Sequence, residues 1–324
     1  MQPWLVNFIS TVQLTRLANA FAGVANLWFV VLWCRSHPEE EHLADPLGDM
    51  SIWLLLALTV VIGIGLSTYA GALNDLFDYR KDAAFSPDRP IAAGRISPQY
   101  AATVGFSSLI IAIISSIVLG PQVSTICLIC AALILLYNTV TRHIPALGFI
   151  TMAAIFGVHM LTVDFGLRFI WPVLLIMVHV TVVHALVYHL EEKRPRMTFL
   201  TMIGTVIGVA GLAVALEAQA GFRGILWGRV YSWYDLMWPL AAVVVFTVTV
   251  VNKVRFASSR AYAAEKLQRY GSLWMGVYGL AWLLGAGLYT ESLFLGAIVL
   301  MGTLWMLVVR DLGAWIEQPV GYRW

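Results

Sequence analysis

The sequence has little charge, and this scarcity sets the class of protein. Of its 324 residues only 12% are Asp, Glu, Lys or Arg, whereas 60% are hydrophobic, and the mean hydropathy is +0.80. Such a composition does not describe the core and surface of a water-soluble domain. The net charge is +2, and no basic block is long enough to indicate nucleic-acid binding. We therefore expect a polytopic membrane protein.

The sequence is also poor in cysteine and in several familiar catalytic motifs. Cys127 and Cys130 form a Cys-x-x-Cys pair inside an apolar segment, and Cys34 stands far from both. We expect all three to be reduced packing residues rather than disulfide or zinc ligands. There is no G-x-x-x-x-G-K-[ST] loop, G-x-S-x-G elbow or histidine pair at metal spacing. The D-G-x-x-A-R signature of CDP-alcohol transferases is missing as well.

What the sequence does have is a series of long apolar segments. The first eleven residues contain no cationic region and no small-residue cleavage site, so we expect the first segment to be retained. Each segment is long enough to cross about 30 Å of hydrocarbon. They are 14–35, 51–73, 98–119, 121–140, 145–163, 169–190, 199–219, 236–254, 272–290 and 291–310. The last two are barely separated, so the sequence predicts one all-α transmembrane domain, residues 1–324, with nine or ten spans.

The placement of basic residues predicts the orientation. With the N-terminus in the cytoplasm, sixteen of the twenty Lys and Arg residues fall on the inner side. The four on the outer side are Arg35, Arg168, Arg223 and Arg229. This is a positive-inside bias. The acidic segment 38–49 is then an outer connector, and the basic segment 253–269 is expected to lie along the headgroups as an amphipathic connector.

Acidic residues are concentrated after the second span, in the run N-D-L-F-D-Y-R-K-D from Asn74 to Asp82. At about 100° per residue, Asn74, Asp75, Asp78 and Asp82 lie within about 100° of arc. Each carboxylate costs about 2.5–3.5 kcal/mol at membrane depth, and neighbouring carboxylates repel, so a cation must compensate. Hard oxygen ligands favour Mg²⁺, which bridges to substrate phosphates. The alternative is a solvated helix end that happens to be acidic.

This run, with the tail S-P-D-R-P-I-A-A-G-R-I-S at 86–97, resembles the first aspartate-rich motif of the UbiA superfamily of intramembrane prenyltransferases. The likeness covers the layout of most of the chain, and its specific part is residues 74–97. It implies a helical bundle around a central cavity, with nine spans as the usual number. It also implies Mg²⁺-dependent transfer of a prenyl group from a prenyl diphosphate to a lipophilic acceptor, aromatic or lipid. The expected location is the bacterial cytoplasmic membrane, with the mouth of the site toward the cytoplasm.

The resemblance assigns roles to residues near this motif. Asn74, Asp75, Asp78 and Asp82 would hold Mg²⁺ on the diphosphate. Basic side chains would neutralise the leaving group as the allylic C–O bond ionises. These are Lys81, Arg89 and Arg95.

The first span carries a polar stripe of Arg16, Asn19, Gly23 and Asn26. In the family an Arg and an Asn at the spacing of Arg16 and Asn19 face the cavity, so both are expected to bind substrate. Packing between helices is the alternative for this stripe.

Two later spans carry further residues that the family pattern bears on. Asn138 and Arg142 follow a Tyr at the end of the fourth span, where related sequences carry a small polar residue and then a cation, and both are candidate substrate ligands. The fifth span departs from the family, because Phe156 and His159 stand where an Arg and an Asn are common. His159 is either a substrate ligand or a packing residue.

A second acidic motif is expected at the end of the sixth span. At about 100° per residue, His184, Tyr188, Glu191 and Glu192 share one helix face. Two glutamates replace the usual three aspartates, and they either hold a second Mg²⁺ or form a salt-bridge cluster with the basic residues that follow. Tyr188 and His184 are candidates for orienting or deprotonating the acceptor.

Two other functional classes remain open. A UbiA-like protein could bind or export a prenylated or otherwise hydrophobic molecule without catalysis, and the thinned second motif is compatible with that. A purely structural membrane subunit is disfavoured by the intact first motif.

Overall fold

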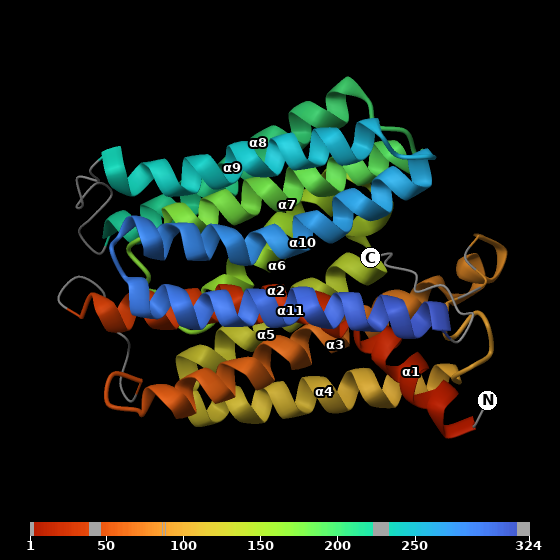
Figure 1. Ribbon diagram of the computed structural model, residues 1–324, viewed down its shortest axis with the longest axis horizontal. Helices are drawn as coiled ribbons and strands as arrows, with labels where there is room; N and C mark the ends of the chain where they lie inside the picture. Colours follow the sequence, from red (N-terminus) through yellow and green to blue (C-terminus); the bar gives the residue numbers. More distant parts are fainter. Residues whose placement is uncertain (1–2, 39–46, 86, 88, 223–232, 316–324) are drawn as a thin grey trace.

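Helices account for nearly all of the described chain, as the composition predicts. The computed structural model describes residues 3–38, 47–85, 87, 89–222 and 233–315, and within these ranges it contains no strand. The elements are α1 (Pro3–Thr15), α2 (Leu17–Ser36), α3 (Ile52–Phe85), α4 (Pro98–Leu119), α5 (Pro121–Thr139), η1 (Thr141–His143), α6 (Pro145–Met160), α7 (Trp171–Leu190), α8 (Phe199–Phe222), α9 (Trp233–Arg255), α10 (Arg260–Gly285) and α11 (Tyr289–Trp315). Figure 1 shows them as a bundle of long, roughly parallel rods.

The boundaries of α4 and α5 agree with the predicted spans because local sequence determines them. The Ser97 hydroxyl accepts a hydrogen bond from the amide of Tyr100, and Pro98 takes the first position of α4. Gly120, at φ 117°, ends α4, and Pro121 begins α5. The predicted boundary between the spans 272–290 and 291–310 is wrong by about one turn, since the break lies at 286–288, where Gly287 has φ 75°.

The predicted nine or ten spans are not confirmed. Seven described helices are long and apolar enough to cross a membrane, and α1 with α2 makes an eighth if the bent pair is one span. With 16 residues, α6 is shorter than the roughly 20 that a perpendicular span needs. The first turns of α10 carry four charged residues, Arg260, Glu265, Lys266 and Arg269.

The predicted headgroup connector at 253–269 is also wrong. α9 continues to Arg255, and α10 already begins at Arg260, where the hydroxyl of Ser259 accepts a hydrogen bond from the Tyr262 amide. A capping serine followed by helix-forming residues accounts for this start.

The first predicted span is broken. α1 and α2 meet at an angle of 45°, and Arg16 between them takes a left-handed conformation with φ 46° and ψ 38°. The expected continuous polar stripe therefore does not exist as one helix face. The side chain of Asn19 lies outside the described residues.

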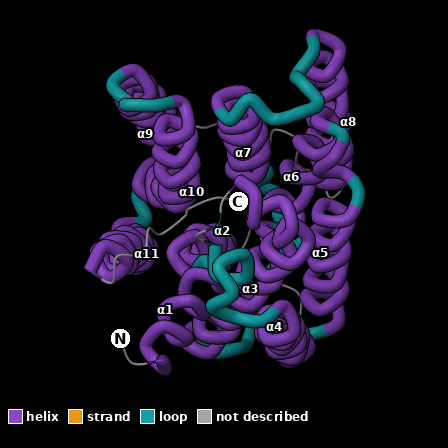
Figure 2. Tube along the Cα trace, turned by 90° about the vertical axis from the view of Figure 1, so that its right-hand side faces the viewer, coloured by secondary structure: helices purple, strands orange, loops and turns teal. Residues whose placement is uncertain are grey.

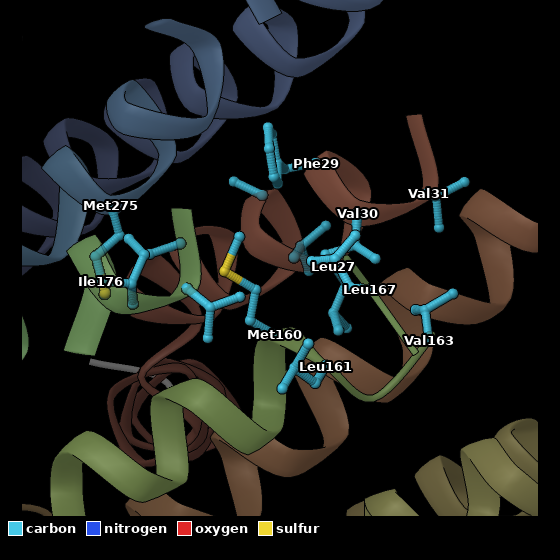
Figure 3. Close-up of a cluster of buried hydrophobic side chains, with 14 of the residues drawn as sticks. Leu27, Phe29, Val30, Val31, Met160, Leu161, Val163, Leu167, Ile176 and Met275 are labelled. Carbon is cyan, nitrogen blue, oxygen red and sulfur yellow. The ribbon is translucent and has the colours of Figure 1, made fainter. Parts of the chain in front are cut away.

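The main core surrounds α2. Figure 2, which looks along the bundle, shows this helix enclosed by α3, α6, α10 and α11, each of which contacts it. Leu27, Phe29 and Val30 are fully buried. Figure 3 shows Leu27 and Val30 in one cluster with Met160, the last residue of α6, and with Leu161, which follows it. The centre of the bundle is therefore tightly packed at this depth.

The pair α3 and α4 packs closely through small residues. A Cβ placed on Gly65 would stand 2.6 Å from the carbonyl oxygen of Ser108, and one on Gly105 would stand 2.7 Å from the Cβ of Ala72. Small residues let helix backbones approach in this way in membranes. This packing fixes α3, the helix that carries the acidic motif.

A separate small hydrophobic cluster lies at the end of the bundle where α3 leads into α4 (Figure 1, right). It joins Leu14 of α1, Ala72 of α3, Ile91 and Ile96 of the α3–α4 connection, and Ala101 of α4. We call it the connection cluster. It holds the segment that carries Arg89 against the helices.

Candidate active site

The acidic motif occupies the last turns of a continuous helix. With 34 residues, α3 is about 50 Å long at about 1.5 Å per residue, so its end extends beyond the hydrocarbon thickness. Asn74, Asp75 and Asp82 are buried, and the Asp78 side chain is 20% exposed. The expected acidic face is thus present, turned mainly into the protein.

Two arginines compensate the inner aspartates, one distant in sequence and one from the connection that follows α3. Nη2 of Arg16 lies 2.6 Å from Oδ1 of Asp75. Nη1 of Arg89 lies 3.3 Å from the same oxygen and 2.7 Å from Oδ2 of Asp82. Arg16 reaches Asp75 from the break between α1 and α2, so that break places the guanidinium. Buried carboxylates require such partners.

The outer aspartate has its own arginine. Arg142, in the 3₁₀ turn η1, donates from Nη1 to Oδ2 of Asp78 at 3.0 Å and lies 2.9 Å from Oδ1 through Nη2. Each aspartate of the motif therefore contacts an arginine, and the three acids are balanced by three cations. We call these six residues the Asp–Arg network.

The donor set of the network fits a magnesium ion in its chemistry. Carboxylate oxygens from one helix face, with the Asn74 amide beside them, are the hard ligands that Mg²⁺ prefers. In the described part of the chain, no group of three His, Cys, Asp or Glu side chains converges closely enough to hold a metal as placed. The carboxylates are directed at arginines instead, so holding a metal requires the arginines to move.

A cavity opens beside the network. Its empty volume is about 800 Å³, including the open mouth. Its walls come from α2, α3, α5 and α6, with Arg16 at the break before α2, and are mostly apolar. The lining residues are Arg16, Gly23, Leu66, Ser67, Ala70, Gly71, Asn74, Ile134, Tyr137, Asn138, Met152, Ile155, Phe156 and His159.

Three polar side chains in the cavity wall have unsatisfied atoms. They are Nδ2 of Asn74, Oδ1 of Asn138 and both ring nitrogens of His159. All three side chains are buried. Nδ2 of Asn138 is used locally, donating to the Ile134 carbonyl. Because buried polar groups are nearly always hydrogen-bonded, these atoms indicate where polar ligand groups belong.

The remaining basic candidates lie farther from the aspartates. Lys81 is exposed on the outer side of α3. Arg95 donates from Nη2 to Oε1 of Gln13 on α1, at 3.2 Å. The structure therefore brings Arg16, Arg89 and Arg142 to the acidic motif.

The four residues of the second predicted motif do not share a helix face. α7 ends at Leu190, and Glu192 has φ 51°, so the chain leaves the helix before the second glutamate. Nζ of Lys193 lies 2.8 Å from Glu191, and Arg260 pairs with Glu192. Of the two glutamates, Glu191 thus pairs with a basic residue that directly follows it, whereas the partner of Glu192 comes from α10.

The other two residues of this motif bind backbone carbonyls. The hydroxyl of Tyr188 donates to the carbonyl of Pro195 at 2.6 Å, and Nδ1 of His184 lies 2.9 Å from the Val180 carbonyl within its own helix. Tyr188 also packs edge-on against Phe149.

Sequence reasoning missed several residues of this site. Tyr137 and Ser67 line the cavity, and Gln13 fixes Arg95. Both cavity residues carried a weak signal as polar residues inside apolar helices, since Tyr137 directly precedes Asn138 and Ser67 lies about two turns before Asn74. Gln13 carried none, because its role depends on how α1 folds back.

Comparisons with known proteins agree with this architecture. Relatives include the digeranylgeranylglyceryl phosphate synthase of Natronomonas pharaonis, 32% identical over 111 residues, which are 34% of this chain and 40% of the relative. The protein of the same name from Methanoregula boonei is 33% identical over 102 residues, 31% of this chain and 36% of the relative. The matched segments thus span less than half of either relative.

A solved structure from work on the biosynthesis of digeranylgeranylglyceryl phosphate synthase in membranes has a TM-score of 0.56 and 16% identity. The match covers 86% of this chain and 98% of that one, and at this identity it shows the fold. The model of the UbiA prenyltransferase family matches residues 46–269, more than half of the chain. The chain therefore belongs to the UbiA prenyltransferase family.

Proposed function

We propose that this protein transfers a prenyl group from a prenyl diphosphate to a lipophilic acceptor inside the membrane, with Mg²⁺ as cofactor. The observation that carries the proposal is the Asp–Arg network at the mouth of a mostly apolar cavity. A diphosphate is an anion attached to a long hydrocarbon. The network offers charge to its head, and the cavity offers an apolar place for its tail.

The acidic residues are assigned to the metal. Asp75, Asp78 and Asp82, with Asn74 beside them, would hold Mg²⁺ against the diphosphate. The metal supplies charge neutralisation for the departing diphosphate.

The arginines are assigned to the phosphates. Arg16, Arg89 and Arg142 are already within reach of the same carboxylates. They can exchange a carboxylate for a phosphate oxygen, since both accept bidentate hydrogen bonds from guanidinium. Lys81 and Arg95 stand farther out, as second cations near the entrance.

The acceptor side is assigned to α5, α6 and α7. Asn138 and His159 line the cavity, and Tyr188 packs edge-on against Phe149 of α6. The relatives' name suggests a glyceryl phosphate lipid as one acceptor to test. The proposed location is a cytoplasmic membrane with the network toward the cytoplasm, as the sixteen-to-four distribution of basic residues favours.

A non-catalytic binder or transporter of a hydrophobic molecule is the second candidate. The observation that favours it is the state of the second acidic motif, where Glu191 and Glu192 are engaged by Lys193 and Arg260. A second metal site would need these ion pairs to open.

The deciding experiment uses purified protein, prenyl diphosphates of several chain lengths and a lipid extract, with and without Mg²⁺. We expect Mg²⁺-dependent release of pyrophosphate together with a prenylated lipid. Asp75→Asn should abolish release, and Arg80→Gln, which changes an exposed residue of the same helix, should leave it intact. Tight binding of prenyl diphosphate without turnover in any extract would favour the transport candidate.

A further inference from the structure

A buried histidine in the cavity wall has no hydrogen-bond partner in the described part of the chain. His159 lies at the end of α6 and is 7% exposed. Neither Nδ1 nor Nε2 has a partner among the described residues. By contrast, the buried His179 contacts the carbonyl of Gly271 at 2.9 Å and the hydroxyl of Tyr278 at 3.2 Å. His159 thus departs from the pattern of a satisfied packing histidine.

The neighbours of His159 leave its ring accessible. It faces Gly23 on α2, where a Cβ would stand 3.3 Å from Cε1 and 3.4 Å from Nε2. The same Cβ would stand 3.4 Å from the hydroxyl oxygen of Ser67 on α3. Gly23, Ser67 and His159 therefore form one polar spot in the cavity wall.

This spot lies at a useful distance from the Asp–Arg network. Ser67 and Asp75 are eight residues apart on α3, which corresponds to about 12 Å along the helix. A diphosphate held at Asp75 would fill the near part of that length. Its first allylic carbon then points toward Ser67 and His159, and an attacking atom about 3–3.5 Å beyond that carbon comes close to the imidazole.

The charges of the cavity restrict what can bind there. Arg16 is the one charged residue among the described lining residues, and its guanidinium is paired with Asp75. A carboxylate on the acceptor would have no counter-charge at the depth of His159. A neutral hydroxyl, which donates one hydrogen bond and accepts another, matches an imidazole with a free nitrogen.

We infer that the acceptor of this protein reacts through a neutral hydroxyl group, and that His159 accepts the proton of that hydroxyl. The inference rests on the proposed function. As the allylic C–O bond breaks, its electron pair leaves on the diphosphate oxygen. A lone pair of the hydroxyl oxygen forms the new C–O bond, and the hydroxyl proton moves to an imidazole nitrogen. The imidazolium then returns the proton to the diphosphate product. The product is an ether.

The test separates donor binding from transfer. The unreactive donor analogue geranylgeranyl thiolodiphosphate with Mg²⁺ reports the donor site. Geranylgeranyl diphosphate with 1-O-hexadecylglycerol, its dimethyl ether or 4-hydroxybenzoate reports the acceptor chemistry. The variants are His159→Gln, which keeps hydrogen bonding without a useful base, and Gly23→Ala, which crowds Nε2. His189→Gln, an exposed histidine on α7, is the matched control.

We expect the wild type to prenylate 1-O-hexadecylglycerol on oxygen and to leave the dimethyl ether unreacted. His159→Gln should bind the analogue within twofold of wild type while kcat falls about 10²–10⁴-fold, the range for loss of a general base. Gly23→Ala should raise KM for the hydroxyl lipid, and His189→Gln should match wild type.

Two results would overturn the inference and leave the proposed function standing. One is a His159→Gln protein with wild-type kcat. The other is a wild type that binds the analogue but prenylates 4-hydroxybenzoate on carbon and no hydroxyl lipid. A wild type that fails to bind the analogue with Mg²⁺ would overturn both. Analogue binding also reports whether the site is folded, so a misfolded His159→Gln protein would be recognised by its failure to bind the analogue. In that case the KM of Gly23→Ala for the hydroxyl lipid, compared with that of the wild type, decides.

Discussion

Arg142 and Asp78 are 64 residues apart, yet two guanidinium nitrogens meet two carboxylate oxygens, at 3.0 Å and 2.9 Å. This fork fastens the turn between α5 and α6 to the end of α3. It thereby fixes one wall of the cavity relative to the acidic motif. A lysine cannot reproduce it, because an ammonium is a point charge without a planar fork.

The first prediction concerns this fork. Arg142→Lys should lower the free energy of unfolding by about 1.5–3 kcal/mol, the range for a lost hydrogen bond to a charged group. The lower end is expected, because the two side chains are 13% and 20% exposed and water screens them. Unfolding in mixed micelles would measure the change. Arg260→Lys, at the exposed pair with Glu192, is the matched control and should change stability by less than about 1 kcal/mol. Equal losses in the two variants would contradict the fork's role.

The second prediction concerns the sign of an aspartate substitution. From the sequence alone, Asp78→Asn should relieve repulsion between carboxylates and leave stability level or higher when metal is absent. The structure reverses this expectation, because Asp78 is the counter-charge of Arg142. We expect a lower melting temperature for Asp78→Asn without metal, together with loss of Mg²⁺-dependent diphosphate binding.

A double variant provides the control for that sign. Adding Arg142→Gln to Asp78→Asn removes the unpaired cation, so part of the lost stability should return. A single variant as stable as wild type would show that repulsion among the aspartates dominates.

This reversal shows where sequence reasoning about the site ends. The aspartates and Asn74 could be found from helical spacing, since that periodicity is local. Arg16, Arg89 and Arg142 were expected near the substrate, but their ion pairs with the aspartates were not, because Arg16 and Arg142 reach α3 only through the break before α2 and the 3₁₀ turn. Long-range ion pairs leave no periodic pattern in a sequence. Of the three cations expected beside the motif, Arg89 pairs with Asp75 and Asp82, whereas Lys81 is exposed and Arg95 binds Gln13.

The third prediction tests the packing of α3 on α4. Gly65→Ala should lower stability by about 1–3 kcal/mol, because the new methyl group would stand 2.6 Å from the Ser108 carbonyl oxygen and the backbones must separate. Gly211→Ala on α8 is the control, since nothing lies within 4 Å of its added Cβ. It should be neutral or stabilising by up to about 1 kcal/mol through helix propensity. A stabilising Gly65→Ala would contradict the close approach.

The fourth prediction separates the two glutamates after α7. The Glu191 side chain is 15% exposed, whereas that of Glu192 is 68% exposed. Glu191→Gln should therefore lower kcat by about tenfold, equivalent to about 1.4 kcal/mol, whereas Glu192→Gln stays within about twofold of wild type. If turnover survives both changes together, these residues form only a salt-bridge cluster, and the Asp–Arg network carries the reaction alone.

The fifth prediction is topological. Ser258, between α9 and α10, should be labelled from the cytoplasm after substitution by Cys, and Thr290, at the start of α11, from the other side. Both positions are exposed. The native Cys34, Cys127 and Cys130 are buried and can be removed to leave one thiol per protein. Labelling of both positions from the same side would refute the positive-inside assignment.

The fold was more predictable than the site, and its errors have local causes. Pro98 and Pro121 mark helix starts that are predictable from the sequence, because proline is favoured at the first position of a helix. The break at Arg16 could not be predicted from the local sequence, because an arginine rarely adopts the left-handed backbone conformation. The ion pair that stabilises Arg16 there is with Asp75, which lies on another helix. The early start of α10 was not predicted, because its charged first turns have the composition of a surface connector. The structure shows that α9 ends at Arg255 and that α10 begins at Arg260.

The connection cluster has a thermodynamic consequence for substrate binding. Ile91 and Ile96 anchor both sides of the short turn that follows Arg89, and Leu14 ties them to α1. This segment therefore loses its conformational entropy when the protein folds, not when an anion binds. A diphosphate would meet a guanidinium already held in place, so its binding should show little of the unfavourable entropy that accompanies the ordering of a loose loop.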